Sequence, residues 1–174
     1  MAALTDDRVR AVFGELDAQA VYREVKQTGD FLGFTRRFMQ SDDERVARNA
    51  FWVLTKATDK ELSQLQVILN ELIDLALTTA SSSVRRLSLN IIERLEMKED
   101  DLRTDFLDFC LEHMSDVDEL PGIQSISMKL AYSMCKFYPE LLAEFKATLE
   151  SMEPEFFKPA VNCVRNRILN GKLK

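Results

Sequence analysis

The sequence predicts an all-α fold, and three observations lead to that prediction. Apolar residues recur at helical spacing along most of the chain, and one helical pattern repeats four times. The 5 glycines and 4 prolines among 174 residues are too few for the many tight turns of an all-β fold. With 46% hydrophobic residues, the chain is also too apolar to stay disordered. We therefore expect long helices packed in one array.

The repeated pattern is an apolar anchor residue followed four positions later by a small one. Successive anchors are 38, 39 and 33 residues apart, a period typical of α-solenoids in which each unit is a pair of helices. A small residue lets a neighbouring helix approach closely, so we interpret these segments as the second, or B, helices of the pairs. The four pairs of residues are Val46 with Ala50, Val84 with Ser88, Ile123 with Ser127, and Phe156 with Ala160.

Amphipathic stretches between these segments are interpreted as the first, or A, helices. Cap and break residues precede the B helices, where serine, aspartate and proline favour a helix start. The predicted starts are Ser41-Asp42-Asp43, Ser81-Ser82-Ser83, Pro121-Gly122 and Pro154. Residues 1–28 are expected to form an N-terminal helical cap, and residues 29–174 the repeat array. The apolar stripes of the A helices are Phe31, Phe34 and Phe38; Leu62, Leu65, Leu69, Leu72, Ile73 and Ala76; Leu102, Phe106, Phe109 and Cys110; and Leu141, Leu142, Phe145 and Leu149.

The two first B helices resemble those of the HEAT-repeat family, which commonly start with an aspartate, then Val-Arg and a small residue. The segments that carry the resemblance are Asp43–Ala50 and Ser81–Ser88. The resemblance covers about residues 30 to 170 and implies a right-handed α-α superhelix of about four helix pairs. It says little about activity, because most HEAT-like proteins are interaction scaffolds and a minority are enzymes.

One face of the B helices carries no acidic residue. A rotation of about 100° per residue places the second, sixth and tenth positions after each anchor opposite the buried row. In HEAT-like solenoids the B helices line the inner side, so the resemblance implies a basic, amide-rich groove. We expect this groove to bind an acidic or extended protein partner, with Arg and Lys attracting carboxylates and Trp as an apolar anchor. The predicted groove residues are Arg48, Trp52, Lys56, Arg86, Asn90, Arg94, Lys129, Lys158 and Asn162.

Two other interpretations of this face stay open. It is an ordinary solvated surface if its cations only form intramolecular salt bridges with nearby acidic residues. Residues 98–119, for example, contain 9 Asp or Glu and only 2 Lys or Arg. It is a nucleic-acid groove if the chain is similar to the HEAT-like DNA glycosylases. The net charge of −6 and the single Trp52 make nucleic acid the less favoured partner.

The sequence contains no recognisable catalytic, metal or cofactor motif. His113 is the only histidine, so a histidine pair for zinc is absent, and we expect it at a helix end or core edge. The glycines lack the spacing of a phosphate-binding loop. Cys110, Cys135 and Cys163 are expected to be buried free thiols, as in a reducing cytoplasm. No signal peptide or membrane span is visible, so a non-enzymatic cytoplasmic protein without a cofactor is predicted.

Overall fold

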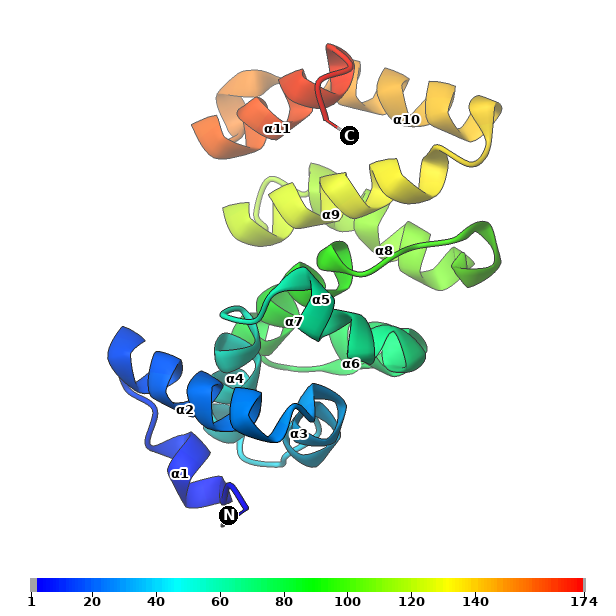
Figure 1. Ribbon diagram of the computed structural model, residues 1–174. Coiled ribbons are helices and arrows are strands. Elements are labelled where there is room, and N and C mark those ends of the chain that lie inside the picture. The colour runs from blue at the N-terminus through cyan, green and yellow to red at the C-terminus, as the bar shows by residue number, and fades with distance from the viewer. Residues whose placement is uncertain (1–2, 174) are drawn as a thin grey trace. The chain divides into compact units, whose positions relative to one another are not determined.

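A computed structural model describes residues 3–173, and every regular element in that range is helical (Figure 1). The α-helices are separated by short turns, and three short 3-10 segments occur among them. In chain order the elements are α1 (Asp6–Arg10), α2 (Glu15–Thr28), α3 (Phe31–Phe38), α4 (Glu44–Leu54), α5 (Asp59–Leu62), η1 (Ser63–Ile68), α6 (Leu69–Thr78), α7 (Ser82–Arg94), η2 (Glu99–Asp101), α8 (Thr104–Ser115), α9 (Pro121–Cys135), α10 (Pro139–Ser151), η3 (Pro154–Phe156) and α11 (Pro159–Leu169).

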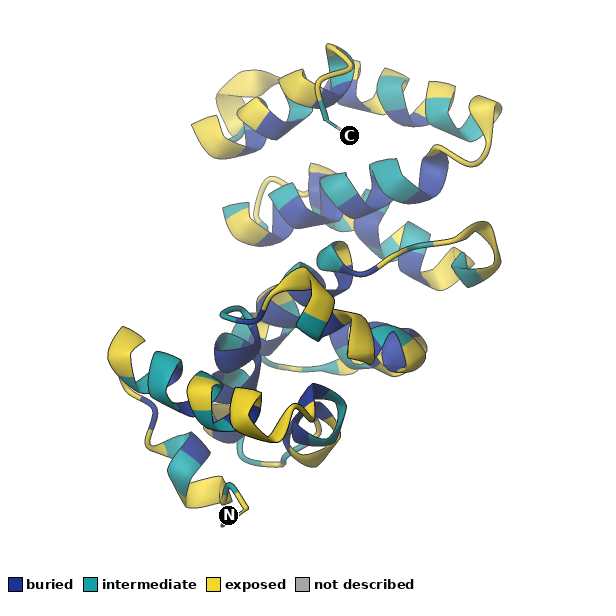
Figure 2. Ribbon diagram, in the orientation of Figure 1, coloured by how far each residue is buried: buried dark blue, intermediate teal, exposed yellow. Residues whose placement is uncertain are grey.

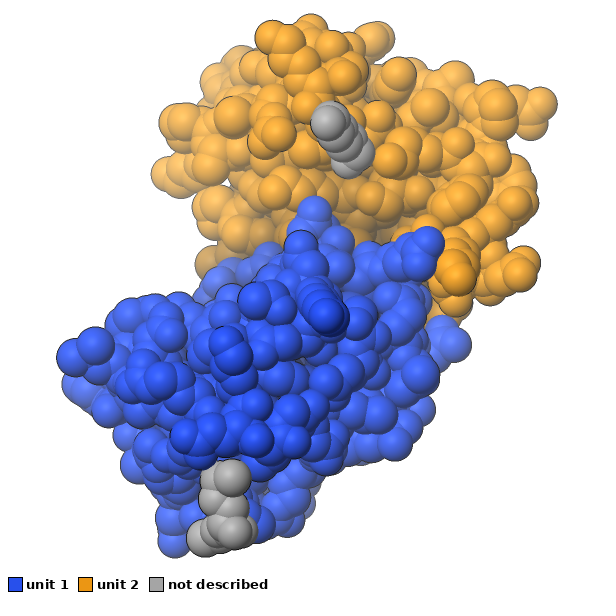
Figure 3. Space-filling model, viewed as in Figure 1, with its two compact units in different colours: residues 1–96 blue, residues 97–174 orange. Residues whose placement is uncertain are grey.

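The helices form two compact units, residues 1–96 and residues 97–174 (Figure 3). In the first unit α1, α2 and α3 pack on α4, and α4, α5 and α6 pack on α7. In the second unit α8, α10 and α11 pack on α9. The predicted B helices α4, α7 and α9 are thus the helices on which the other elements assemble, while the fourth, α11, packs on α9 and α10. The boundary expected at residue 28, between a cap and a repeat array, stays a prediction.

The predicted apolar stripes of the A helices face the core, which they share with the buried sides of the B helices and of α1 and α2 (Figure 2). The stripes of the two first A helices are fully buried, while those of the last two are buried or half-buried. The stripe from Leu62 to Ala76 does not lie on one continuous helix, because the 3-10 segment Ser63–Ile68 interrupts it. Since a 3-10 segment has three residues per turn, it still turns Leu65 and Ile68 toward the same core.

The predicted starts of three B helices are confirmed. Asp43 is the N-cap of α4, where its carboxylate accepts the backbone N–H of Arg45 at 3.0 Å. Ser81 is the N-cap of α7, and its hydroxyl accepts the N–H of Val84 at 3.1 Å. Pro121 occupies the first position of α9, where its missing N–H costs no hydrogen bond.

The predicted start of the fourth B helix is wrong. Pro154 opens only the short segment η3, and α11 begins at Pro159. Phe156, the expected anchor, is 59% exposed, whereas the third residue of α11, Val161, is fully buried. In the other B helices the third residue is likewise the buried anchor. With Val161 as the fourth anchor the steps become 38, 39 and 38 residues, which is a regular repeat.

A polar side chain at the fourth position of three B helices holds the turn that precedes the helix. Arg85 of α7 donates to the carbonyls of Ala76 and Thr79, at 3.0 and 2.6 Å. Gln124 of α9 donates to the carbonyl of Asp116 at 2.6 Å. Asn162 of α11 donates to the carbonyls of Pro154 and Phe157, at 3.0 and 3.3 Å. These carbonyls lie at helix ends or in turns, and those of Asp116 and Pro154 also accept a backbone N–H, from Glu119 and Phe157.

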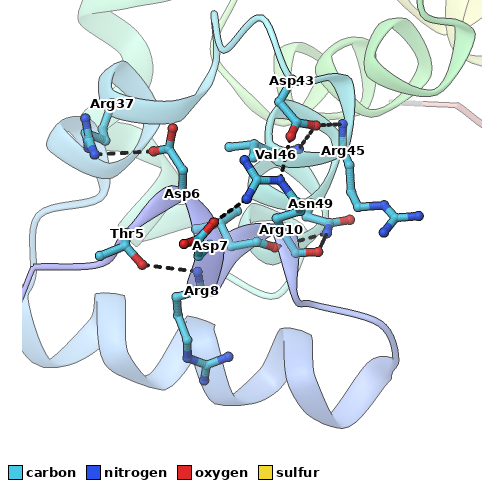
Figure 4. Close-up of polar contacts among 11 residues, drawn as sticks. Thr5, Asp6, Asp7, Arg8, Arg10, Arg37, Asp43, Arg45, Val46 and Asn49 are labelled. Atoms are coloured by element: carbon cyan, nitrogen blue, oxygen red, sulfur yellow. Dashed lines mark hydrogen bonds and ion pairs between the residues drawn. The ribbon is translucent and has the colours of Figure 1, made fainter.

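The first repeat has Ala47 at that position, and two other residues fasten its surroundings (Figure 4). Asn49 is fully buried, and its amide nitrogen donates to the carbonyls at the end of α1, among them that of Val9 at 3.0 Å. The guanidinium of Arg10 binds the carboxylate of Asp43 at 2.6 Å. This hydrogen bond is the main cause that lowers the pKa of Asp43 below its usual value.

We predict that Asn49→Ala lowers the free energy of unfolding by about 2–4 kcal/mol, because several carbonyls at the end of α1 lose their buried donor. Urea denaturation followed by circular dichroism measures the change. The matched control is Asn90→Ala, since the half-buried amide of Asn90 makes no hydrogen bond within residues 3–173. Equal effects of the two substitutions would contradict the structural role of Asn49.

Candidate functional site

Four of the predicted groove residues line one cavity of about 330 Å³ in the first unit. Its walls come from the adjacent B helices α4 and α7, which the repeat period places side by side. The cavity has two cationic groups, one amide, one indole and one hydroxyl, and no carboxylate among its lining residues. Those residues are Arg48, Trp52, Thr55, Arg86, Leu87 and Asn90.

The two arginines of this cavity are available for a ligand. Within residues 3–173, neither Arg48 nor Arg86 makes an ion pair. Arg48 is half-buried and lies 3.3 Å from the amide oxygen of Asn49, a neutral acceptor, whereas Arg86 is exposed. A guanidinium group without a carboxylate partner can form two parallel hydrogen bonds to a carboxylate or phosphate, and Arg48 would exchange its hydrogen bonds to the neutral oxygen of Asn49 for them.

Lys56 and Arg94, also predicted for the groove, have partners inside the protein. Lys56 Nζ lies 2.5 Å from the carboxylate of Glu15. The pKa of Glu15 is lowered by Lys56, then by Gln19 and to a smaller extent by the indole of Trp52. Arg94 binds Asp59 at 2.9 Å and donates to the carbonyl of Ala57 at 2.7 Å.

The three predicted residues of the second unit lie at different places on its helices. Lys129 is half-buried on α9, and Lys158 is the exposed N-cap of α11. Asn162 holds the preceding turn and also lines a hollow of about 600 Å³ along α11. The corrected repeat places Cys163 and Arg167 of this hollow at the positions equivalent to Arg48 and Trp52 of α4. The sequence contained a signal for these two residues, because Pro159 precedes its apolar anchor by two positions, as Pro121 does.

His113 lies at a helix end, as expected. Its ring stacks on Phe109 with the ring centres 3.9 Å apart, and Nδ1 lies 2.6 Å from the carboxylate of Glu119. The histidine thus fastens the turn after α8. Among the described residues, no group of three or more His, Cys, Asp and Glu side chains is placed to hold a metal ion.

The expected burial of the cysteines is correct for two of the three. Cys110 and Cys135 are buried, and Cys163 is exposed on α11. Burial raises the pKa of Cys110, and burial with a smaller contribution from Glu144 raises the pKa of Cys135 to about 11. These two thiols are protonated at neutral pH and therefore poor nucleophiles.

Helices packed in pairs at a regular sequence repeat are the arrangement of an α-solenoid. A HEAT repeat domain family model matches residues 5–172, so the chain belongs to the HEAT repeat domain family. HEAT repeats generally act as scaffolds that bind other proteins. No curated protein and no solved structure matched the chain. Across residues 3–173, no helix is both long and apolar enough to cross a membrane.

We predict that Arg94→Ala lowers the free energy of unfolding by about 1–2 kcal/mol, because the carbonyl of Ala57 loses its donor. Arg86→Ala, which removes an exposed guanidinium, should change it by less than about 0.5 kcal/mol. Chemical denaturation of the two variants tests the difference. A larger loss of unfolding free energy for Arg86→Ala than for Arg94→Ala would contradict the structural role of Arg94 and the exposed position of Arg86.

The three thiols should react at very different rates with Ellman's reagent. Cys163 is exposed and should react at once, while Cys110 and Cys135 should react only when denaturant unfolds the protein. Absorbance at native conditions then corresponds to one thiol per chain and rises to three after unfolding. Cys163→Ser removes the fast phase. Any fast-reacting thiol in that variant would be Cys110 or Cys135 and would show that the core opens readily.

Proposed function

We propose that the chain is a non-enzymatic interaction module that binds an acidic segment of a protein partner on α4 and α7. The observation that carries the proposal is the cavity in which Arg48 and Arg86 flank Trp52 without any carboxylate. The arginines attract side-chain carboxylates, and Trp52 offers a flat apolar surface at the centre. Asn90 adds an amide able to hydrogen-bond a peptide backbone.

The protein itself supplies an example of the contact proposed for the partner. The carboxylate of Glu15 lies against Lys56 and interacts with the indole of Trp52. This places one acidic side chain at the end of the same helical face. A partner carboxylate beside Arg48 would repeat the arrangement about two helical turns away on α4, and one beside Arg86 would repeat it on α7.

The remaining predicted residues have different places in the proposal. Lys56 and Arg94 support the fold around the cavity, since each already has an internal acidic partner. Lys129 and Lys158 of the second unit are proposed to add attraction for an acidic partner through their charge rather than through shaped contacts. A cytoplasmic location is part of the same proposal.

The test is a fluorescence-anisotropy titration with labelled probes. The probes are a peptide of Glu residues with one central Phe, the same peptide with Lys in place of Glu, and single- and double-stranded oligonucleotides. Wild-type protein should bind the acidic peptide, and added salt should weaken the binding. Arg48→Glu with Arg86→Glu should weaken it at least about tenfold, because both attractive charges become repulsive.

The matched control is Arg36→Glu with Lys60→Glu, which makes the same change of charge at two exposed residues outside the cavity. This control should bind like the wild type, and thermal melts should show that both double variants stay folded. Equally weak peptide binding by both double variants would show that only the net charge of the protein matters, and this would overturn the proposed site. Oligonucleotide binding that depends on Arg48 and Arg86, without peptide binding, would establish the nucleic-acid alternative instead.

A further inference from the structure

The turn between α8 and α9 is acidic, yet it exposes two apolar side chains. Val117 and Leu120 are 53% and 50% exposed, and Asp116 and Asp118 beside them are also exposed. Single exposed apolar residues are common on protein surfaces. Two of them within one five-residue acidic turn, which we call the acidic loop (residues 116–120), form a small mixed surface.

The acidic loop is held in one conformation by hydrogen bonds. Glu119 binds the stacked ring of His113, and the carbonyl of Asp116 accepts from Gln124 at 2.6 Å. The N–H of Asp118 donates to the Asp116 carboxylate at 2.9 Å, and the N–H of Leu120 donates to the carboxylate of Glu119 at 2.8 Å. Because the loop is already ordered, binding through it would require little additional ordering of its backbone.

A surface of complementary character lies in the first unit, and we call it the basic-apolar surface. Its apolar part is the turn before α2 together with the first turn of α2, where Phe13 and Leu16 are 93% and 83% exposed. Glu15, which lies between these two residues in sequence, contacts Lys56 and Trp52 and so joins the turn to the end of α4.

The same turn is also fixed to the rest of α4 and to α2. Asn49, next to Arg48 in sequence, donates to the carbonyl of Val12 at 3.0 Å. The N–H of Phe13 donates to the carboxylate of Asp17 at 3.1 Å. Its exposed apolar side chains are therefore displayed by an ordered backbone, next to the helix that carries one of the two unpaired arginines.

We propose that the acidic loop of one copy of the chain docks on the basic-apolar surface of a second copy. Val117 and Leu120 would contact Phe13, Leu16 and Trp52, while Asp116 and Asp118 would face Arg48 and Arg86. The proposal rests on the proposed function for the basic half of the contact and names a second copy as the partner. A second copy is argued from complementarity of charge and of apolar content, since one chain carries both halves.

The two docking surfaces differ, so the association is head-to-tail. An assembly therefore has one unoccupied docking surface at each of its two ends, and further chains can add there. The surfaces are small, so association should be weak and visible only at high micromolar concentration. Head-to-tail geometry has a specific consequence, because two variants damaged on opposite surfaces can pair with each other but cannot extend.

Sedimentation velocity over a range of concentrations tests the proposal. The average mass of the wild type should rise with concentration. Two double variants should each stay monomeric, one with Arg48→Glu and Arg86→Glu and the other with Val117→Ser and Asp118→Lys. The second, the loop variant, keeps the hydrogen bond from residue 118 to Asp116, because the backbone N–H donates it. Mixing the two variants should give a species of twice the monomer mass and nothing larger, because each retains the surface that the other lacks.

The control for the loop variant is Val67→Ser with Asp108→Lys, which makes the same changes at exposed residues of other elements and should self-associate like the wild type. A wild type that stays monomeric at all concentrations would overturn the proposal, as would a mixture of variants that does not pair.

Failure of self-association is separable from failure of the proposed function. The loop variant keeps Arg48 and Arg86 and should still bind the Glu-rich peptide probe. If the wild type is monomeric but binds that probe through the two arginines, the proposed function stands and the head-to-tail contact does not. If copies associate and the probe does not bind, the surface is specific for the acidic loop and the general acidic-partner function is refuted.

Discussion

The turn inside each helix pair is the constraint on which the rest of the structure depends. A helix that ends and reverses leaves backbone carbonyls without helical partners, and burying them unpaired would be costly. Arg85, Gln124 and Asn162 meet this requirement from the fourth position of their helices. That residue lies one turn into the B helix, so its hydrogen bonds to the preceding turn fix how the helix is rotated relative to the turn. This rotation decides which face of the B helix is buried.

The rotation of the B helix in turn decides which polar residues are available to a partner. On α4 and α7 it leaves Arg48, Trp52 and Arg86 around one cavity, while Asn49 and Arg85 point to backbone carbonyls. Adjacent residues of one helix thus have opposite roles. Three basic residues of the B helices, Arg85, Arg94 and Arg165, donate to backbone carbonyls, so counting cations along the helix does not by itself locate a binding site.

Most of the fold could be predicted from the sequence, because helical periodicity and cap residues are local signals. The stripes of the A helices, the caps Asp43 and Ser81, and the Pro121 start all follow from residues within one or two turns of each other. The fourth start was misplaced because Pro154 and Pro159 both satisfy the local rule for a helix start. The burial of Val161 and the exposure of Phe156 decide for Pro159, which is also the choice that makes the repeat regular.

The sequence by itself determined the helical class, the repeat period, and the polar face of the first three B helices. In the fourth B helix the misplaced anchor also misplaced that face. The tertiary structure alone decided which of the polar residues are already bound. Lys56 meets Glu15 and Arg94 meets Asp59 and Ala57 across 35 or more positions of sequence, and no local pattern encodes such pairs. Long side chains reach whichever acceptor the packing brings near, so their availability to a partner depends on the folded neighbours rather than on spacing.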